Sequence, residues 1–299
     1  MKRFNFKLVG FFVAVIASFL SLESCSKNRI EDEKKMNEYS SINSYMDTKK
    51  QEEQEFIIDT TGSGPIIGKQ GTKIWTGKQC LMFPNGDSVT WPYTLKLVEL
   101  YTPKDMIYYQ MPTVSNGEIL KTGGEIRLRA FKNGTELVLK PDPCMHQIEM
   151  PSTNPQANMR VFNNPSPYQN WIEENPVNLF TTSVSSYIAS LHTLGWINCG
   201  IKAGSTTNST LTFSSTTDNL DNVGIFIYFP ATKSVMQVSN KVSQSIPNGS
   251  DVKIVLIGVD ASGNLFSYYE NRNVTSSATI DIKLTAITDA ALTTVLDGL

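Results

Sequence analysis

The sequence has few of the residues that build most catalytic and metal centres. Its 299 residues include two histidines and four cysteines. Motifs of the Gly-x-Ser-x-Gly, His-Glu-x-x-His and protein-kinase kinds do not occur, so the common signatures of serine hydrolases, zinc proteases and kinases are missing. No cluster of basic residues is suited to a phosphate backbone, and the formal net charge is −2. We therefore expect neither an enzyme nor a nucleic-acid partner.

Long hydrophobic runs are absent as well. Residues 8–20 are apolar except for one glycine and one serine, which gives about a dozen residues where a bilayer needs roughly 20. Lys2, Arg3 and Lys7 precede this run. A cationic start followed by a short apolar core predicts a cleaved secretion signal and not a membrane-spanning helix.

The signal ends in Leu22-Glu23-Ser24-Cys25, which resembles the lipobox of bacterial lipoproteins. Glu23 departs from the small or apolar residue usual at its position. The resemblance implies that residues 1–24 are removed and that lipid on the thiol of Cys25 anchors the protein to a membrane. Two or more acyl chains hold such an anchor stably. Cleavage would remove three basic residues and one acidic residue, which changes the formal net charge from −2 to −4.

Residues 25–55 differ in composition from the rest of the chain. They are rich in charged residues and have hardly any large aliphatic ones, so they cannot bury enough apolar surface to offset the entropy of ordering. This predicts a disordered or weakly helical tether. Its acidic cluster Glu31-Asp32-Glu33 resembles the export signal of lipoproteins in Bacteroidetes-type bacteria. The resemblance implies a lipid anchor in the outer membrane and exposure on the cell surface.

From residue 56 to residue 150, short β-rich runs alternate with turn signals. The turn signals are Pro84-Asn85-Gly86, Asn116-Gly117, Gly123-Gly124 and Asn133-Gly134, whose residues tolerate positive φ. An Asn-Gly pair between two strand-like runs is typical of a β-hairpin. The pattern predicts antiparallel sheets packed as a sandwich, and the fold class is all-β.

Several phrases in this part resemble the ZU5-like β-sandwich found near the amino terminus of bacterial surface lipoproteins. They are Gly71-Thr72-Lys73-Ile74, residues 95–101, Asp105-Met106, residues 113–120, and Gly123-Gly124-Glu125-Ile126 followed by Ala130. The resemblance covers residues 56–150 and consists mostly of apolar and turn positions. It implies a fold and no particular activity.

The remainder of the chain predicts a second domain. Residues 151–174 are rich in proline and asparagine, which indicates a surface linker, and we expect Trp171 within it to dock onto a neighbouring domain. Residues 175–299 predict a second β-sandwich that resembles the carboxypeptidase regulatory-like type. Thr288 is placed to cap a short helix that Gly298 ends. The chain is thus two β-sandwich domains in tandem after a signal peptide and a charged tether.

Residues 62–70 have the glycines and the lysine of a phosphate-binding loop, but not its spacing. Gln70 stands where a hydroxyl would hold Mg²⁺, and a strand-like segment follows instead of a helix. A glycine-rich turn is the better interpretation.

Cysteine and histidine leave more than one option. Cys144 and His146 form one close pair, and Cys80, His192 and Cys199 would have to complete a zinc site that normally uses two close pairs. We therefore expect no metal. In an exported protein, two of the three cysteines after Cys25 can form a disulfide, or all three can be buried thiols.

Acidic residues offer two further candidates. Glu99, Glu118 and Glu125 supply a glycosidase pair if the fold brings two of them together. The Asp and Asn residues of 218–222 offer oxygens to Ca²⁺, although without the spacing of an EF-hand, so a solvated turn is the simpler interpretation.

Two tyrosine pairs, Tyr108-Tyr109 and Tyr268-Tyr269, lie in strand-like runs. Strand alternation would turn one ring of each pair toward solvent. An outward tyrosine can stack on a sugar or anchor a protein, and more often packs across a strand pair.

Together these observations predict a membrane-anchored bacterial surface lipoprotein that is a non-enzymatic binding, adhesion or structural module. No cofactor is expected, and the ligand would be a protein or a glycan. The alternative is a hydrolase or carbohydrate-active accessory protein whose site is built from scattered carboxylates. That alternative requires two carboxyl groups in one concave cluster.

Overall fold

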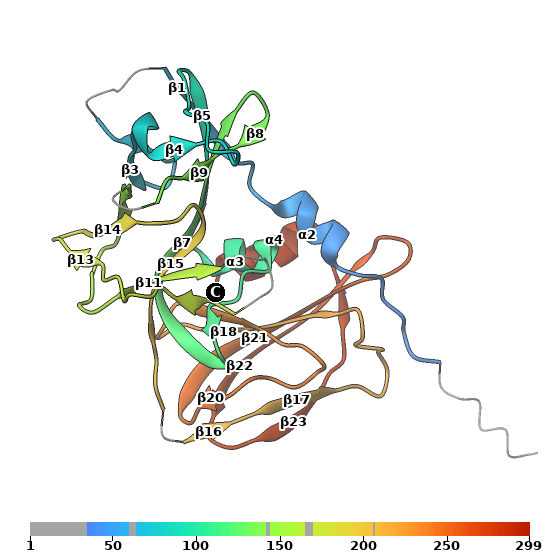
Figure 1. Cartoon of the computed structure of the whole chain (residues 1–299). Helices are drawn as coiled ribbons and strands as arrows, with labels where there is room; N and C mark the ends of the chain where they lie inside the picture. Colours follow the sequence, from blue (N-terminus) through green and yellow to red (C-terminus); the bar gives the residue numbers. More distant parts are fainter. Residues whose placement is uncertain (1–34, 60–63, 142–143, 165–169, 206) are drawn as a thin grey trace, which may run out of the picture. The chain divides into compact units, whose positions relative to one another are not determined.

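The computed structural model describes residues 35–59, 64–141, 144–164, 170–205 and 207–299. The predicted signal peptide, Cys25 and the acidic cluster at residues 31–33 lie outside these ranges. Contacts divide the chain into Met1–Asn37 and Glu38–Leu299, and the second unit holds the helices and strands described below (Figure 1). Within the described ranges, no helix is long and apolar enough to cross a bilayer.

Residues 54–202 form a β-sandwich of two antiparallel sheets. The first sheet has the order β1-β5-β7-β15-β11-β12, and the second has the order β13-β14-β10-β3-β2. The strands of the first are β1 (Gln54–Ile58), β5 (Tyr93–Leu100), β7 (Glu118–Lys132), β15 (Gly195–Lys202), β11 (Arg160–Asn164) and β12 (Ile172–Glu173). Those of the second are β13 (Thr181–Thr182), β14 (Ser186–Leu191), β10 (His146–Pro151), β3 (Lys73–Trp75) and β2 (Ile66–Ile67).

The core of this sandwich follows from strand alternation. Leu95 and Leu97 of β5 are two residues apart, so their side chains lie on the same face of the sheet. They are buried in one cluster with Ile126 of β7 and Ile148 of β10. This part also contains η1 (Lys78–Cys80), β4 (Leu81–Met82), β6 (Val114–Ser115), β8 (Thr135–Glu136) and β9 (Val138–Leu139). β6 and β8 each pair with β7, and β4 pairs with β9 in a separate two-stranded sheet.

Three of the four predicted turns are confirmed. Asn116-Gly117 joins β6 to β7 and Asn133-Gly134 joins β7 to β8, all four residues with positive φ. The backbone N–H of Gly86 donates to the carbonyl of Phe83 at 2.9 Å in the third turn. The prediction of a turn at Gly123-Gly124 was wrong, because both glycines lie inside β7.

Residues 208–287 form a second layered β module. One sheet has the order β19-β18-β21-β22-β24, and two short pairs, β17-β23 and β16-β20, pack against it. The strands are β16 (Asn208–Ser209), β17 (Leu211–Ser214), β18 (Gly224–Phe229), β19 (Ser234–Gln237), β20 (Ile246–Pro247), β21 (Ser250–Val259), β22 (Leu265–Val274), β23 (Ala278–Asp281) and β24 (Thr285–Ile287). Strands dominate both modules, so the all-β prediction is confirmed.

Three short helices complete the fold: α2 (Asn43–Lys49), α3 (Pro103–Tyr109) and α4 (Asp289–Asp297). The predicted cap of α4 is confirmed, because the hydroxyl of Thr288 accepts from the N–H of Ala291. Helix α3 lies where a strand was expected. Thr102 caps it through the N–H of Asp105 and a proline follows at the first helical position, which is a helix-start signal.

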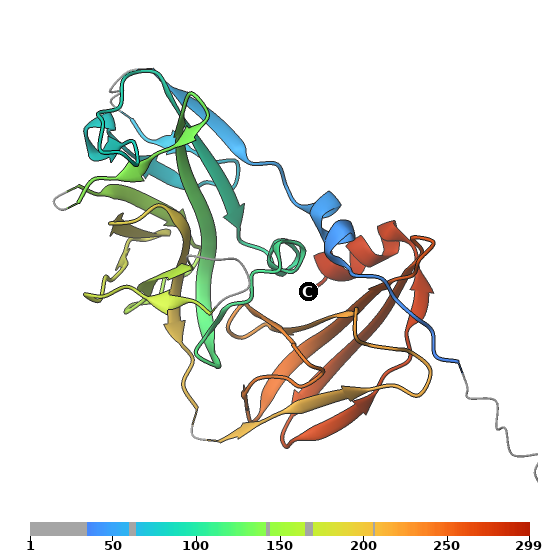
Figure 2. The ribbon, with the colours of Figure 1, turned by 45° about the vertical axis from the view of Figure 1, so that its right-hand side comes forward.

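The three helices lie side by side (Figure 2) and share one hydrophobic cluster with both β modules. Val98 and Leu100 of β5, Met106 of α3, Phe226 of β18 and Ile257 of β21 belong to it. Trp171 is fully buried in the same cluster, and its indole N–H donates to the carbonyl of Pro112 at 2.9 Å. Trp171, which was expected to dock onto a neighbouring domain, thus packs in a cluster to which both β modules contribute.

Strand pairing does not follow the predicted domain boundaries at residues 150 and 175. β15 lies after the expected linker, yet it pairs with both β7 and β11 in the centre of the first sheet. Residues 151–174 contain β11 and β12 of that sheet and are not only a linker. The boundary lies after Lys202 because the sandwich needs β15 to join its two halves.

Residues 38–50 belong to the fold, so the prediction of an unordered tether over residues 25–55 was wrong for this part. Ile42, at the N-cap of α2, and Met46, within α2, are four residues apart and therefore lie on the same side of the helix. Both are buried in the shared cluster. Lys49 forms an ion pair with Asp289 of α4 at 2.6 Å. Buried apolar residues and this ion pair hold the segment on the fold despite its charged composition.

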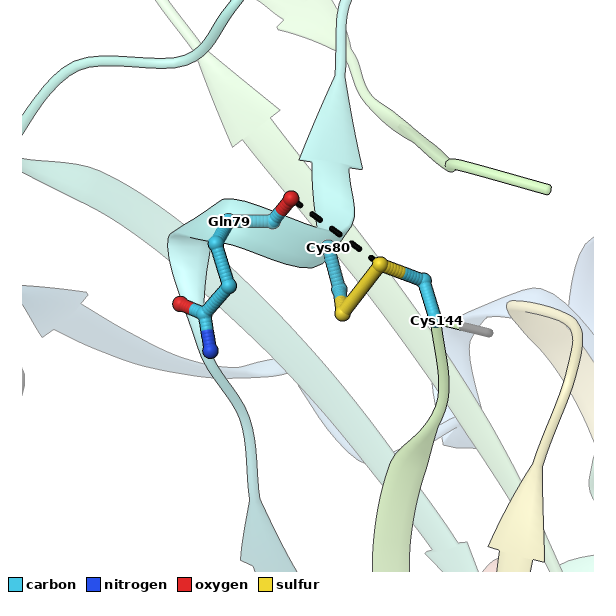
Figure 3. The surroundings of a disulfide bond; sticks show 3 residues. All are labelled: Gln79, Cys80 and Cys144. Atoms are coloured by element: carbon cyan, nitrogen blue, oxygen red, sulfur yellow. Dashed lines mark hydrogen bonds between the residues drawn. A yellow bond between two sulfur atoms is a disulfide. The ribbon is translucent and has the colours of Figure 1, made fainter. Parts of the chain in front are cut away.

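The cysteines are distributed as one disulfide and one thiol. Cys80 and Cys144 are bonded, with their Cα atoms 5.0 Å apart and a separation of 64 in sequence (Figure 3). Cys199 of β15 is a buried free thiol in the sandwich core. Of the options left open by the sequence, the structure selects a single bridge that ties η1 to the start of β10.

We predict that Met46→Ala lowers the free energy of unfolding by about 2–5 kcal/mol, because it leaves a cavity in a fully buried site. Urea denaturation measures the change. Ser44→Ala, on the exposed side of the same helix, is the matched control and should stay within about 0.5 kcal/mol of wild type. A Met46→Ala protein as stable as the control would show that residues 38–50 do not dock.

We also predict that the double variant Cys80→Ser, Cys144→Ser loses about 2–4 kcal/mol of stability, since opening a loop of this length restores entropy to the unfolded chain. Denaturation with and without reductant gives the measurement. Reductant should destabilise the wild type and leave the double variant unchanged. Equal sensitivity of the two proteins would argue against the bridge.

Candidate functional site

A cavity of about 580 Å³ lies where the first sandwich meets the turn between β18 and β19. It is lined by Gln70, by Tyr101 directly after β5, by parts of α3 and β7, by the segments 151–159 and 185–187, and by residues 230–233 of the turn. Its volume lies in the range of about 300–1,000 Å³ typical of small-molecule sites, which often form where two domains meet.

A β-bulge in β7 lies at the base of the cavity. Cys199 of β15 pairs with Gly124. The next pair is Gly200 with Thr122, so Gly123 is an extra residue in β7. A bulge bends a strand locally, and a glycine in a strand often marks a place where another group comes close to the backbone. The bulge brings two residues without side chains to the cavity wall.

The missing side chains make room for two tyrosine rings. A Cβ atom on Gly123 would lie 2.6 Å from the ring of Tyr187, and one on Gly124 would collide with the ring of Tyr101. Gly124 also has a φ of +132°, which other residues rarely adopt. The two glycines therefore allow both rings to pack against the strand.

The hydroxyl groups of these tyrosines are held by hydrogen bonds. The hydroxyl of Tyr101 shares a 2.7 Å hydrogen bond with the hydroxyl of Thr72. The hydroxyl of Tyr187 accepts from the backbone N–H of Gln156 at 2.9 Å. Burial raises the pKa of Tyr101 far above its usual range, so this ring stays neutral. The rings form a fixed, uncharged part of the wall.

The β18–β19 turn also lines the cavity, and a backbone hydrogen bond joins it to β7. The N–H of Thr122 donates to the carbonyl of Thr232 at 3.0 Å. This places Lys233, at a φ of +54°, on the same cavity as Lys121 of β7. No acidic residue is among the described residues that line the cavity, and neither lysine has an ion pair there.

The rest of the rim is polar and has unused hydrogen-bonding capacity. The side chains of Ser152, Thr153, Asn154, Gln156 and Ser185 line the cavity and make no hydrogen bond with the described part of the chain. Hydroxyl and amide groups can each donate and accept. The cavity therefore combines partly apolar walls, a neutral polar rim and two positive charges.

The glycine-rich turn after β2 holds an anion, but that anion belongs to the protein. The backbone N–H groups of Gln70 and Thr72 donate to the two carboxylate oxygens of Glu99, each at 2.9 Å. The amide of Gln54 adds a third hydrogen bond at 2.8 Å. A Cβ atom on Gly68 would lie 2.6 Å from this carboxylate. The described part of the segment that resembles a phosphate loop is thus a turn built around Glu99.

The carboxylates considered for a glycosidase pair do not meet in the cavity. Glu118 is exposed and pairs with Lys202 at 3.0 Å. Glu125 is fully buried, and its carboxyl group accepts from the side-chain amide of Asn198 at 3.0 Å. Burial raises the pKa of Glu125 well above its usual range, which favours the protonated form. With Glu99 enclosed by its turn, none of the three lines the cavity.

The cysteines and histidines are not gathered either. Cys80 and Cys144 are bonded to each other, Cys199 is in the sandwich core, and His192 is exposed at the end of β14. His146 is fully buried. Among the described residues, no group of three or more His, Cys, Asp or Glu side chains is placed to hold a metal ion.

The loop considered for Ca²⁺ binds the amino-terminal segment instead. Asp218 is buried and accepts a 2.7 Å hydrogen bond from the hydroxyl of Tyr39. The side-chain amide of Asn222 donates to the carbonyl of Tyr39 at 2.9 Å, and Asn219 donates to Glu38 at 3.0 Å. These oxygens and amides fix the start of the folded unit.

The two tyrosine pairs differ. Tyr108 and Tyr109 are both buried because their segment is helix α3, so the expectation of one outward ring was wrong there. Tyr269 of β22 is 41% exposed while Tyr268 is partly buried, as strand alternation predicts. Neither pair lies at the cavity.

No protein-family model, curated protein or solved structure matches this chain. The site is therefore interpreted from its geometry. Sequence reasoning missed the cavity, although one signal for it was present: a Gly-Gly pair inside a β-rich run indicates a bulge as well as a turn.

The buried side chain of His146, two residues after the bonded Cys144, allows a test of how the core affects stability at different pH. Neither ring nitrogen has a hydrogen-bond partner in the part of the chain that the structure describes, and burial lowers the pKa of His146 from 6.5 to about 4. The folded protein therefore keeps this ring neutral over a pH range in which the unfolded chain protonates it.

We predict that the free energy of unfolding falls as pH drops from about 6.5 to 4, by up to about 3 kcal/mol from this residue. His146→Phe should remove this share of the pH dependence, and His192→Phe, at the exposed histidine, should retain it. Urea denaturation at pH 7 and pH 4 compares the three proteins. Identical pH profiles for both variants would exclude His146 as the cause.

Proposed function

We propose that this protein is a bacterial surface lipoprotein, anchored in the outer membrane through lipid on Cys25, and that its folded unit is a non-enzymatic binding module. The cavity at the β7 bulge carries the binding part of the proposal. Its rim offers polar side chains without partners in the described chain, and no carboxylate is among the described residues that line it.

The disulfide supports export. Bonded cysteines persist in oxidising compartments such as the periplasm and the cell surface, and are rare in the cytosol. Cys80 and Cys144 are bonded, whereas the third described cysteine is enclosed in the core. The lipobox-like sequence before Cys25 and the ZU5-like and carboxypeptidase regulatory-like resemblances belong to the same proposal.

The start of the folded unit fixes how far the module can lie from its anchor. Cys25 precedes Glu38 by 13 positions, and a fully extended chain of that length spans at most about 45 Å. A tether running to residue 55 would have allowed more than twice this reach. The proposed lipoprotein therefore works close to the membrane.

The alternative, a hydrolase built from scattered carboxylates, is less well supported. It requires two carboxyl groups exposed to substrate in one concave site. Glu99 and Glu125 are fully buried, and Glu118 lies apart from the cavity in an ion pair.

The anchor is tested by feeding cells labelled palmitate and isolating the protein. We predict that wild type carries label, that Cys25→Ala does not, and that the adjacent control Ser26→Ala does. An unlabelled wild type, or equal labelling of the Cys25→Ala protein, would remove the anchor. Protease treatment of intact cells then tests exposure, and full protection would place the protein on the periplasmic side.

A further inference from the structure

We propose that the cavity at the β7 bulge binds an acidic oligosaccharide. The inference rests on the proposed function, since it names the ligand class of that binding module. Three properties of the cavity wall support this inference: its charge, its neutral polar groups and its apolar residues.

The charge of the wall selects for anions. Lys121 and Lys233 are its charged residues, and they come from different modules. Neither forms an ion pair with the described part of the chain, although acidic residues outnumber basic ones in the sequence. A cavity lined by one sign of charge concentrates ligands of the opposite sign. Carboxylate or sulfate groups on a ligand would supply the partners that the protein does not provide.

The neutral polar groups favour a ligand with many hydroxyl groups. Ser152, Thr153, Asn154, Gln156 and Ser185 stand in two segments on one side of the cavity, each with a free hydroxyl or amide. Such groups can donate to one hydroxyl and accept from another, as a sugar ring requires. A ligand recognised mainly through a single phosphate would leave most of them unused.

Apolar residues of the wall supply the contact that a sugar ring also needs. Tyr101, Pro151 and Pro230 line the cavity and are partly or fully exposed, and the first of these is fixed by its hydrogen bond to Thr72. Aromatic and apolar surfaces pack against the C–H faces of sugars, while the polar rim orients the hydroxyl groups. The Thr122–Thr232 hydrogen bond joins the residues next to the two lysines in the chain, and both lysines line the cavity.

The test is calorimetric titration of the full chain, purified in non-ionic detergent, with a panel of uronate-containing, sulfated and sialylated oligosaccharides. Each acidic sugar is paired with a neutral counterpart of the same length, such as an oligogalacturonate and its methyl ester. We predict that at least one acidic sugar binds, that its neutral counterpart binds at least about tenfold more weakly, and that raising salt weakens the binding.

Variants locate the site. Lys121→Ala with Lys233→Ala should weaken binding at least about tenfold, and Ala231→Trp should weaken it by filling the cavity from the exposed turn. Lys283→Ala, at an exposed lysine away from the cavity, should bind as wild type does. Urea denaturation checks that all variants remain folded.

Several outcomes would overturn the inference: no acidic sugar binds, neutral counterparts bind equally well, or the cavity variants bind as wild type does. Its failure is separable from that of the proposed function. Palmitate labelling reports the anchor whether or not a sugar binds, and a sugar-binding protein without lipid would retain the site and lose the anchor.

Discussion

The shared hydrophobic cluster is the interaction on which the rest of the structure depends. Side chains from the first sandwich, from all three helices and from the second module are buried together in it. Each large apolar side chain buried there contributes roughly 1.5–3 kcal/mol, so the modules have a strong reason to remain joined. Their union brings the β18–β19 turn onto β7, where the Thr122–Thr232 hydrogen bond closes the cavity. A site of this kind would not exist on either module alone.

Local signals in the sequence predicted the class of fold, several of its turns and the start of one helix. Asn-Gly pairs marked two hairpins, and Thr288 marked the start of the last helix, because these structures depend on a few neighbouring residues. The module boundary could not be found in this way. β15 enters the first sheet between β7 and β11 through contacts across long stretches of chain. A proline-rich and asparagine-rich composition describes a surface path, but it does not reveal whether that path also contributes strands.

The candidate site was harder to predict because its parts are defined by distant partners. The glycine-rich turn resembled an anion-binding loop for a sound reason, since its backbone does bind a carboxylate, but nothing local identifies Glu99 as that carboxylate. Gly123-Gly124 was interpreted as a turn, and only the pairing with β15 shows it to be a bulge. Lys121 and Lys233 become neighbours across a cavity only after the modules pack, so no spacing in the sequence could have linked them.

The attachment of Tyr39 has a mechanical consequence. Its hydroxyl is bonded to Asp218, its carbonyl to Asn222, and the next residue forms a bridge to Val259. A force applied to the chain before Glu38 would thus act on the second module first. It would have to pull Ile42 and Met46 out of the shared cluster before it reached the first sandwich. Such a force would be borne by buried side chains, and the cavity would keep its shape until that layer gave way.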